Sequence, residues 1–235
     1  MGHRWLALFV GLQLVAWTAS GLFMAAVDID VIHGDTLVRN VAPPVRLDRP
    51  LAPIADVLRG HDDVVALHLR TLPDDGRAVY ELVDSAGKRA LLDATTAAVL
   101  PPFSAERVKS LAEAYYAGRG RVAGVRLLAT DAEIPREVRG RRAPLWRVEF
   151  DDWLETTLYV DAGSGRLATR RHRLWRWFDF AWSLHIMDYR EREDVNNGLL
   201  RTVTPLAVLT ASCGAWLVFY SFAFLRRRPR ARGAA

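Results

Sequence analysis

Cysteine is almost absent from this chain of 235 residues, and the single one, Cys213, lies in a long apolar run near the C-terminus. The segment between the two long apolar runs therefore cannot hold a disulfide, a zinc ion with cysteine ligands or a covalently attached c-type haem. We also expect no lipid attached to a cysteine after the first run. Cys213 itself is typical of a small packing residue within a helix.

The signatures of common catalytic sites are also absent. The sequence has no His-Glu-x-x-His, no phosphate-binding loop and no Gly-x-Ser-x-Gly. The glycine-rich stretch 118–124 follows a predicted helix rather than a strand, so it indicates a helix end and a turn. Asp151, Asp152 and Glu155 form either a cation site or, more simply, a solvated turn between strands. The sequence favours a protein without catalytic activity of its own, leaves enzymatic activity open and predicts no metal site.

Charge is missing from two long stretches, Trp5 to Val27 and Thr202 to Leu225, which contain neither an acid nor a base. About 20 apolar residues, at 1.5 Å rise each, suffice to cross a hydrocarbon core of about 30 Å. The first run is longer than the apolar region of a signal peptide, so we interpret it as an uncleaved anchor. The sequence predicts membrane-spanning helices over 1–27 and 202–225.

The basic residues indicate the orientation of these helices. The chain has 32 basic and 27 acidic residues, and six of the basic ones are Arg4 and the five arginines of the tail 226–235. The positive-inside rule places both ends in the cytoplasm and 28–201 in the periplasm, so we expect a bacterial inner-membrane protein. Without those six arginines the net charge is −1. The basic excess therefore predicts contact with membrane lipids and not with nucleic acid.

The segment between the spans predicts an α+β fold with an internal repeat. In each repeat a helix comes before three strands, and an aspartate, Asp93 or Asp161, ends a strand and caps a tight turn. Residues 28–42 alternate loosely and predict a short strand or an extended linker. The predicted helices cover 51–59 and 104–117, and the predicted strands cover 64–72, 77–83, residues around 91–92, 122–129, 145–150 and 156–160. The predicted parts are a linker 28–50, a first repeat 51–103, a second repeat 104–171, an interfacial helix with its connector 172–201, and the tail 226–235.

Three stretches carry a family resemblance. "TTLYVDAGSGRLATRR" at 156–171 resembles the PepSY domain, while "HRWLAL" at 3–8 and "LWRWFDFAWSLHIMDY" at 174–189, followed by "NN", resemble PepSY-associated transmembrane proteins. The resemblance implies two PepSY-like repeats, each a helix packed on an antiparallel sheet, flanked by two membrane helices. The first repeat departs from the pattern, because Thr95-Thr96-Ala97 stands where the second has Gly163-Ser164-Gly165.

Histidines near the membrane are the candidate cofactor ligands. The Trp-rich segment 172–189 predicts an interfacial helix with His185 on its apolar, aromatic face, where a neutral imidazole could ligate haem b or be an ordinary buried histidine bonded to backbone or a carboxylate. His3, at the cytoplasmic end of the first span, and His33, six residues beyond it, are the other candidates. Their simpler interpretations are an interfacial polar residue and an ordinary domain residue. His3 and His185 cannot share one haem within a chain, whereas His33 lies at the level of His185, and like histidines could pair in a homodimer.

Three functions follow as hypotheses. The favoured one is a membrane-anchored periplasmic PepSY-like module that binds or regulates a partner, since PepSY-like proteins have been linked to protease inhibition and envelope regulation. The alternative is a haem b-binding electron-transfer partner, because larger PepSY-associated membrane proteins resemble ferric-siderophore reductases. The third is a sensor that needs a separate output protein. A homodimer or a membrane-protein partner is compatible with each.

Overall fold

The computed structural model describes residues 2–39, 44–45 and 50–226. Within it the chain forms two compact units. We call residues 28–176 the sheet unit, and residues 1–27 together with 177–235 the helical unit. The tail 226–235 falls outside the described residues except for Arg226.

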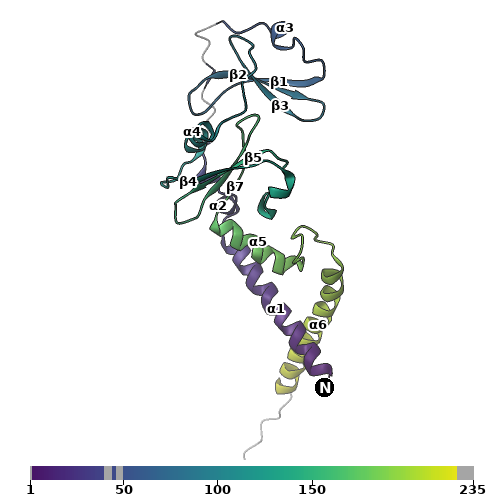
Figure 1. Cartoon of the computed structure of the whole chain (residues 1–235). Helices are drawn as coiled ribbons and strands as arrows, with labels where there is room; N and C mark the ends of the chain where they lie inside the picture. Colours follow the sequence, from purple (N-terminus) through teal and green to yellow (C-terminus); the bar gives the residue numbers. More distant parts are fainter. Residues whose placement is uncertain (1, 40–43, 46–49, 227–235) are drawn as a thin grey trace, which may run out of the picture. The chain divides into compact units, whose positions relative to one another are not determined.

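The sheet unit contains two antiparallel sheets, as an α+β protein of the predicted class requires (Figure 1). The first sheet has the order β1-β2-β3, with the strands Val64–Thr71, Ala78–Asp84 and Arg89–Asp93. The second has the order β4-β5-β6-β7, with the strands Val122–Leu128, Leu145–Phe150, Thr157–Asp161 and Leu167–Arg171. The first six of these strands coincide closely with the predicted ones, whereas β7 is an addition. Two single-turn 3₁₀ helices, η2 (Asp131–Glu133) and η3 (Arg136–Val138), lie between β4 and β5.

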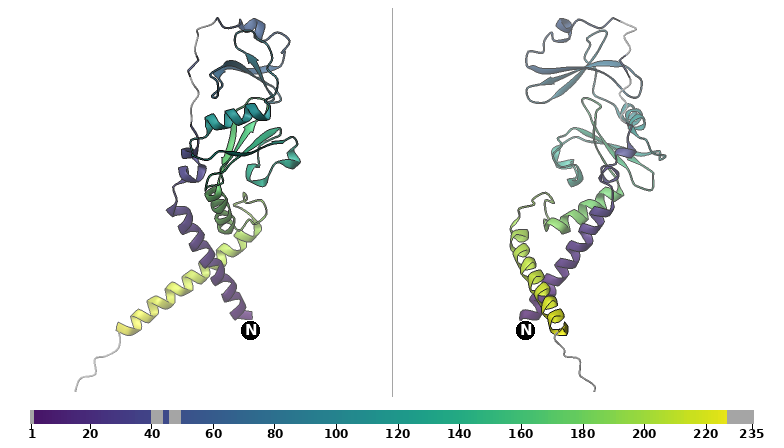
Figure 2. Two further views of the ribbon diagram at one scale, coloured as in Figure 1. Left: turned by 60° about the vertical axis from the view of Figure 1, so that its left-hand side comes forward. Right: turned by 180° about the vertical axis from the view of Figure 1, so that it is seen from behind.

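Helix α4 (Ala105–Tyr115) corresponds to the predicted helix 104–117 and covers one face of the second sheet (Figure 2). The Ser104 hydroxyl caps it by accepting a hydrogen bond from the backbone N–H of Arg107 (3.3 Å). Val108 and Ala112 of this helix are fully buried in one apolar cluster with Val148 and Leu158 of the sheet. This cluster is one of the apolar cores of the sheet unit, and in it the helix and the sheet each bury their apolar face against the other.

The helix predicted for the first repeat is much shorter than expected. Only α3 (Ile54–Val57) is helical, Ile54 is 58% exposed, and Val57 is its single buried residue. Isolated helices of this length gain little from their own hydrogen bonds, and here Pro53 begins the turn while Gly60 adopts a left-handed φ of +80° soon after it. The first sheet therefore has one helical turn beside it rather than a packed helix.

The segment after the first apolar run also differs from the prediction. The sequence of 28–42 predicts a strand or a linker, but a short helix α2 (Ile29–His33) and a 3₁₀ turn η1 (Asp35–Leu37) form within it, and residues 40–42 lie outside the described residues. The Asp28 carboxylate accepts from the N–H of Asp30 (2.8 Å), and Gly34 ends the helix at φ +70°. Capping at both ends thus overrides the loose alternation of apolar residues.

The turns at Asp93 and Asp161 have the same construction. In each, the aspartate carbonyl accepts a hydrogen bond from the backbone N–H four residues later. The aspartate carboxylate accepts two more, from the hydroxyl and the backbone N–H of one residue, which is Thr95 in the first turn and Ser164 in the second. The Thr95 hydroxyl bond, together with backbone bonds, lowers the pKa of Asp93 to about 2 despite partial burial. The predicted correspondence of these two aspartates is therefore present in local geometry.

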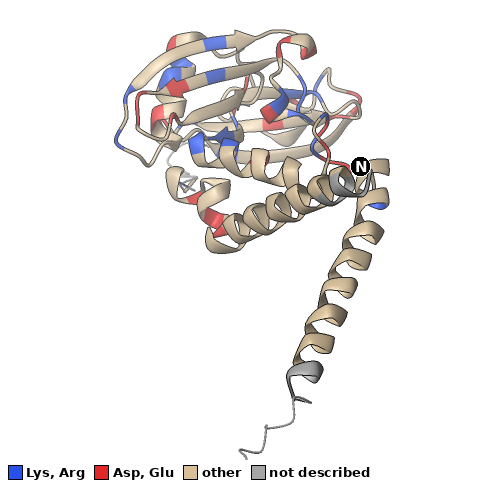
Figure 3. Cartoon of the chain, turned by 90° about the horizontal axis from the view of Figure 1, so that it is seen from below, with Lys and Arg blue, Asp and Glu red and all other residues tan. Residues whose placement is uncertain are grey.

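The helical unit holds α1 (Gly2–Ala26) and α6 (Gly198–Arg226), and most of α5 (Arg173–Ile186). Two stretches, Leu8–Ala26 and Gly198–Phe222, are long and apolar enough to cross a membrane, and only 11% of each is buried. Figure 3 shows both helices as long runs without charged residues. Because their apolar side chains are exposed, these helices are not core helices of a soluble fold, and a lipid environment suits them.

A loop between α5 and α6 is organised around one carboxylate. Asp188 accepts hydrogen bonds from four backbone N–H groups, those of Arg190, Glu191, Glu193 and Asp194, at 3.0 to 3.2 Å. These bonds lower the pKa of Asp188 to about 2. The stretch 188–194 is therefore an ordered turn, and most of its side chains are exposed.

Candidate functional site

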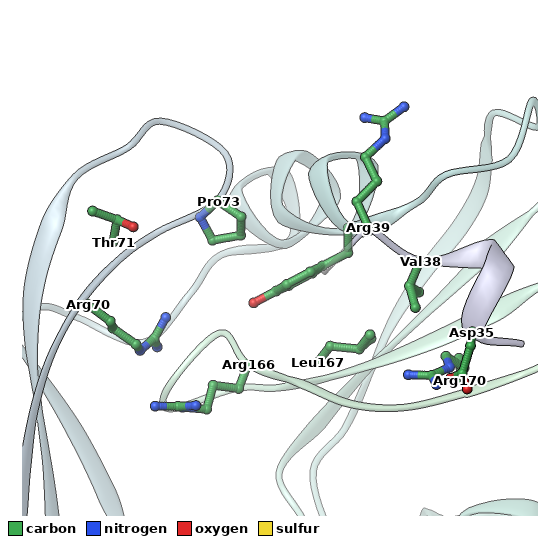
Figure 4. Close-up of a pocket in the computed structure, with 10 residues that line it drawn as sticks. Asp35, Val38, Arg39, Arg70, Thr71, Pro73, Arg166, Leu167 and Arg170 are labelled. Atoms are coloured by element: carbon green, nitrogen blue, oxygen red, sulfur yellow. Dashed lines mark ion pairs between the residues drawn. The ribbon is translucent and has the colours of Figure 1, made fainter. Parts of the chain in front are cut away.

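The sheet unit contains a cavity of about 690 Å³ with an unusually basic wall (Figure 4). Four arginines and one aspartate contribute to the wall. The lining residues are Asp35, Val38, Arg39, Arg70, Thr71, Pro73, Tyr115, Arg166, Leu167 and Arg170. The volume falls within the range of about 300–1,000 Å³ that is common for ligand sites.

Edge strands and one short segment bring these residues together. Arg70 and Thr71 end β1, an edge strand of the first sheet, while Leu167 and Arg170 belong to β7, an edge strand of the second. Arg39 is placed by backbone pairing with the end of α4, since its N–H donates to the carbonyl of Tyr115 at 2.7 Å. The cavity therefore depends on three parts of the chain that are far apart in sequence.

A buried carboxylate lies behind the cavity and holds two of its arginines. Glu81, on β2, has a side chain that is 1% exposed. Its Oε2 accepts from Nε of Arg70 at 2.8 Å and from Nη2 of Arg166 at 2.7 Å, and Arg89 approaches Oε1 at 3.6 Å. Arg70 also donates to the carbonyl of Ser164. The pair of Glu81 and Arg166 joins the two sheets, because Arg166 belongs to the turn between β6 and β7.

Figure 4 shows the guanidinium groups of Arg70 and Arg166 together on one side of the cavity, and the pair of Asp35 and Arg170 on the other. Arg170 forms an ion pair with Asp35 and donates from Nε to the carbonyl of His33 (2.8 Å). Arg39 has no ion-pair partner among the residues that the structure describes, and its side chain is exposed. Among the described residues, Arg39 is therefore the one arginine of the wall without an acidic partner.

Tyr115 contributes an aromatic wall rather than a base. Burial raises the pKa of its hydroxyl, although the nearby Arg70 partly opposes this, so the phenol is neutral at physiological pH. The hydroxyl donates to the carbonyl of Gly165 at 3.1 Å. The wall combines guanidinium groups, a phenol and apolar side chains, with no paired nucleophile and base. Within the described residues there is also no group of three His, Cys, Asp or Glu side chains able to hold a metal ion. The guanidinium groups suit the binding of an anion.

His185, the leading ligand candidate from the sequence, lies in the helical unit against α1. Its Nδ1 is 3.2 Å from the hydroxyl of Ser20, and its carbonyl accepts from the indole N–H of Trp17 at 2.5 Å. The Ser20 hydroxyl also lies 2.7 Å from the carbonyl of Ala16 and 3.1 Å from that of Trp17. When it donates to one of these carbonyls it accepts from Nδ1–H of His185, and this tautomer carries its lone pair on Nε2.

The other candidates lie elsewhere. His33 is exposed and belongs to the sheet unit, where its carbonyl is engaged by Arg170. His3 lies in α1, and its side chain is outside what the structure describes. The structure thus places one candidate, His185, in a defined hydrogen-bonded setting.

His172 is a structural histidine that the sequence did not single out as a ligand. It is 1% exposed, and its Nε2 lies 3.0 Å from the carbonyl of Ile32. Burial lowers the pKa of the imidazole, which the backbone bond partly offsets. A side chain at Gly34 would approach within 3.1 Å of this ring, so a glycine is needed there for close approach as well as for its positive φ. His172 therefore anchors α2 beside the start of α5.

Comparison of the chain with models of protein families, with curated proteins and with solved structures finds no match.

Proposed function

We propose that this protein is a membrane-anchored binding module whose sheet unit takes an anionic ligand in the arginine-lined cavity. The observation that carries the proposal is that Arg39, Arg70, Arg166 and Arg170 all line one cavity, with the guanidinium groups of Arg70 and Arg166 on one side of it and that of Arg39 directed away from them (Figure 4). Guanidinium groups bind carboxylates and phosphates through paired N–H donors, which favours recognition of anions. The two exposed apolar helices supply the anchor. Such a module acts on a partner or ligand without catalytic activity of its own.

Binding of an anion is testable on the full-length protein in detergent. Glutarate or inorganic phosphate, at constant ionic strength, is expected to raise the midpoint of thermal unfolding relative to chloride. The reason is that a ligand of the folded state at one hundred times its Kd stabilises by about 2.7 kcal/mol. For a chain of this size 1 kcal/mol corresponds to about 2–4 °C. A midpoint that no organic or inorganic anion moves beyond the chloride control would contradict the proposal.

We further propose that the module is PepSY-like, lies in a bacterial inner membrane with the sheet unit in the periplasm, and has both termini in the cytoplasm. The arginine-rich tail supports this orientation. A reporter that works only in the cytoplasm is expected to be active when it is fused after Arg232, and one that works only in the periplasm is expected to be inactive there. After Gly60, which follows the first span alone, the periplasmic reporter should be active and the cytoplasmic one inactive. Periplasmic activity of the fusion after Arg232 would overturn the orientation.

A second candidate function, haem b binding for electron transfer, is favoured by the state of His185. Ligand histidines normally donate one ring N–H to a fixed acceptor, which leaves the other nitrogen free to bind the metal. The tautomer of His185 whose Nδ1–H donates to Ser20 has this arrangement, with the lone pair on Nε2. His185 would hold the haem iron, and haem would supply the redox chemistry when bound.

A further inference from the structure

Resting on the proposed function, we propose that the ligand of the arginine-lined cavity is an acidic segment of a protein partner, which presents a carboxylate to the side of the cavity formed by Arg70 and Arg166. The proposal deepens the general expectation of an anion into one chemical class. It is carried by the contacts that the cavity arginines already make, by the charge balance of the wall and by the exposure of its rim.

The cavity arginines already recognise carboxylates within the protein. Arg70 and Arg166 both bind the carboxylate of Glu81, and Arg166 does so through Nε at 2.9 Å and 2.7 Å to the two oxygens and through Nη2. At the other side of the cavity Arg170 holds the carboxylate of Asp35. The planar fork of a guanidinium matches this anion in two parallel hydrogen bonds. A carboxylate from outside would repeat an interaction for which these side chains are already oriented.

The charge balance leaves room for such a group. Five arginines, the four of the wall and Arg89, are opposed by the carboxylates of Glu81 and Asp35. The neighbouring Arg107 is paired with Asp74 and Asp75. Among these described residues, six guanidinium groups are set against four carboxylates, which leaves two positive charges. An acidic segment would neutralise this excess, whereas a cationic or neutral segment would not.

The exposure of the rim favours a large partner over a small metabolite. The side chain of Arg166 is 43% exposed and that of Asp35 is 45% exposed, and Arg39 lies open to solvent. Sites for small molecules commonly enclose about 70–90% of the ligand surface. A wet rim of charged residues around a less exposed centre is instead typical of a protein interface. Val38 and Leu167 add apolar contacts for the aliphatic parts of the segment.

The test uses full-length protein in detergent and a fluorescent peptide of alternating glutamate and alanine, with binding followed by fluorescence anisotropy. Wild-type protein is expected to bind this peptide, to bind the matched glutamine peptide at least about tenfold more weakly, and to lose affinity as salt rises. The variant Arg39→Glu should weaken binding about tenfold, since it reverses a charge on the rim. Because Arg39 is exposed and unpaired among the described residues, the Arg39→Glu protein should have the same midpoint of thermal unfolding as wild type.

The matched control is Arg126→Glu, which makes the same charge change on β4. Strand β4 is the edge of the second sheet opposite to β7, the strand that lines the cavity. This variant should bind the peptide as wild type does. Equal binding by the Arg39→Glu and wild-type proteins, or equal binding of the two peptides, would overturn the proposal. If inorganic phosphate stabilises the protein and the glutamate peptide does not bind, the acidic-segment proposal falls while the proposed function stands. If no anion binds, both fall.

Discussion

Replacing Glu81 by alanine is expected to lower the free energy of unfolding by about 3–5 kcal/mol. The carboxylate is 1% exposed and is the common partner of Arg70 and Arg166, with Arg89 at its side. Its removal leaves guanidinium groups crowded together with no anion between them, and the side chain of Arg70 is only 13% exposed. An unpaired buried charge costs far more than the intact pair contributes, because water cannot replace the lost partner.

Chemical denaturation of the full-length protein in detergent, followed by tryptophan fluorescence, would measure this loss. Arg89→Gln is the matched control within the same cluster. Its side chain is 42% exposed and its contact with Glu81 is long, at 3.6 Å, so this change is expected to cost no more than about 1 kcal/mol. A loss below about 1 kcal/mol for Glu81→Ala would show that this cluster does not hold the two sheets together.

Much of the fold could be predicted because its signals are local. The two uncharged runs identify α1 and α6, and the Val- and Leu-rich stretches around 64–72 and 145–150 identify β1 and β5. The predicted helix 104–117 corresponds to α4, which Ser104 caps through its hydroxyl. Each of these elements is determined by residues within its own length, through apolar burial or a cap, so a single sequence is sufficient.

Strand β7, which the sequence does not predict, depends on the rest of the fold. Strand β7 reads Leu-Ala-Thr-Arg-Arg, and each of its residues is half-buried, so it shows no alternation of apolar and polar positions. It forms because β6 offers it an edge to pair with. The short helix α2 was missed for the opposite reason. Its caps, Asp28 and Gly34, are residue types that favour helix ends, whereas the loose alternation of Ile29 and Val31 favours a strand.

The cavity could not be predicted from the sequence. Its arginines lie between positions 39 and 170 in a chain with 32 basic residues, and none stands in a motif. Two edge strands and the pairing of Arg39 with the end of α4 bring them together. Glu81 shows the same limit, since an acidic residue in a predicted strand suggests a solvated position, and only the tertiary structure buries it among arginines.

If His185 ligates haem b, full-length protein purified from haem-supplied cells is expected to show a Soret band that His185→Ala removes or strongly reduces. The physical reason is that, in the tautomer whose Nδ1–H donates to Ser20, the Nε2 lone pair is available to iron. Ser20→Ala keeps the imidazole but removes the acceptor that fixes it. Loss of such an outer partner commonly lowers metal affinity about 10–100-fold, so this variant should retain the band with weaker haem binding.

His61→Ala is the matched control, because it removes an imidazole from the sheet unit, outside the helical unit that contains His185. Its spectrum should equal that of wild type. An intermediate affinity for Ser20→Ala would separate ligation by His185 from a general loss of structure, since a collapsed helical unit would lose haem in both variants alike. A colourless full-length protein that also fails to bind added haemin would end the electron-transfer hypothesis. The anion-binding module would be unaffected, because its arginines belong to the sheet unit and need no haem.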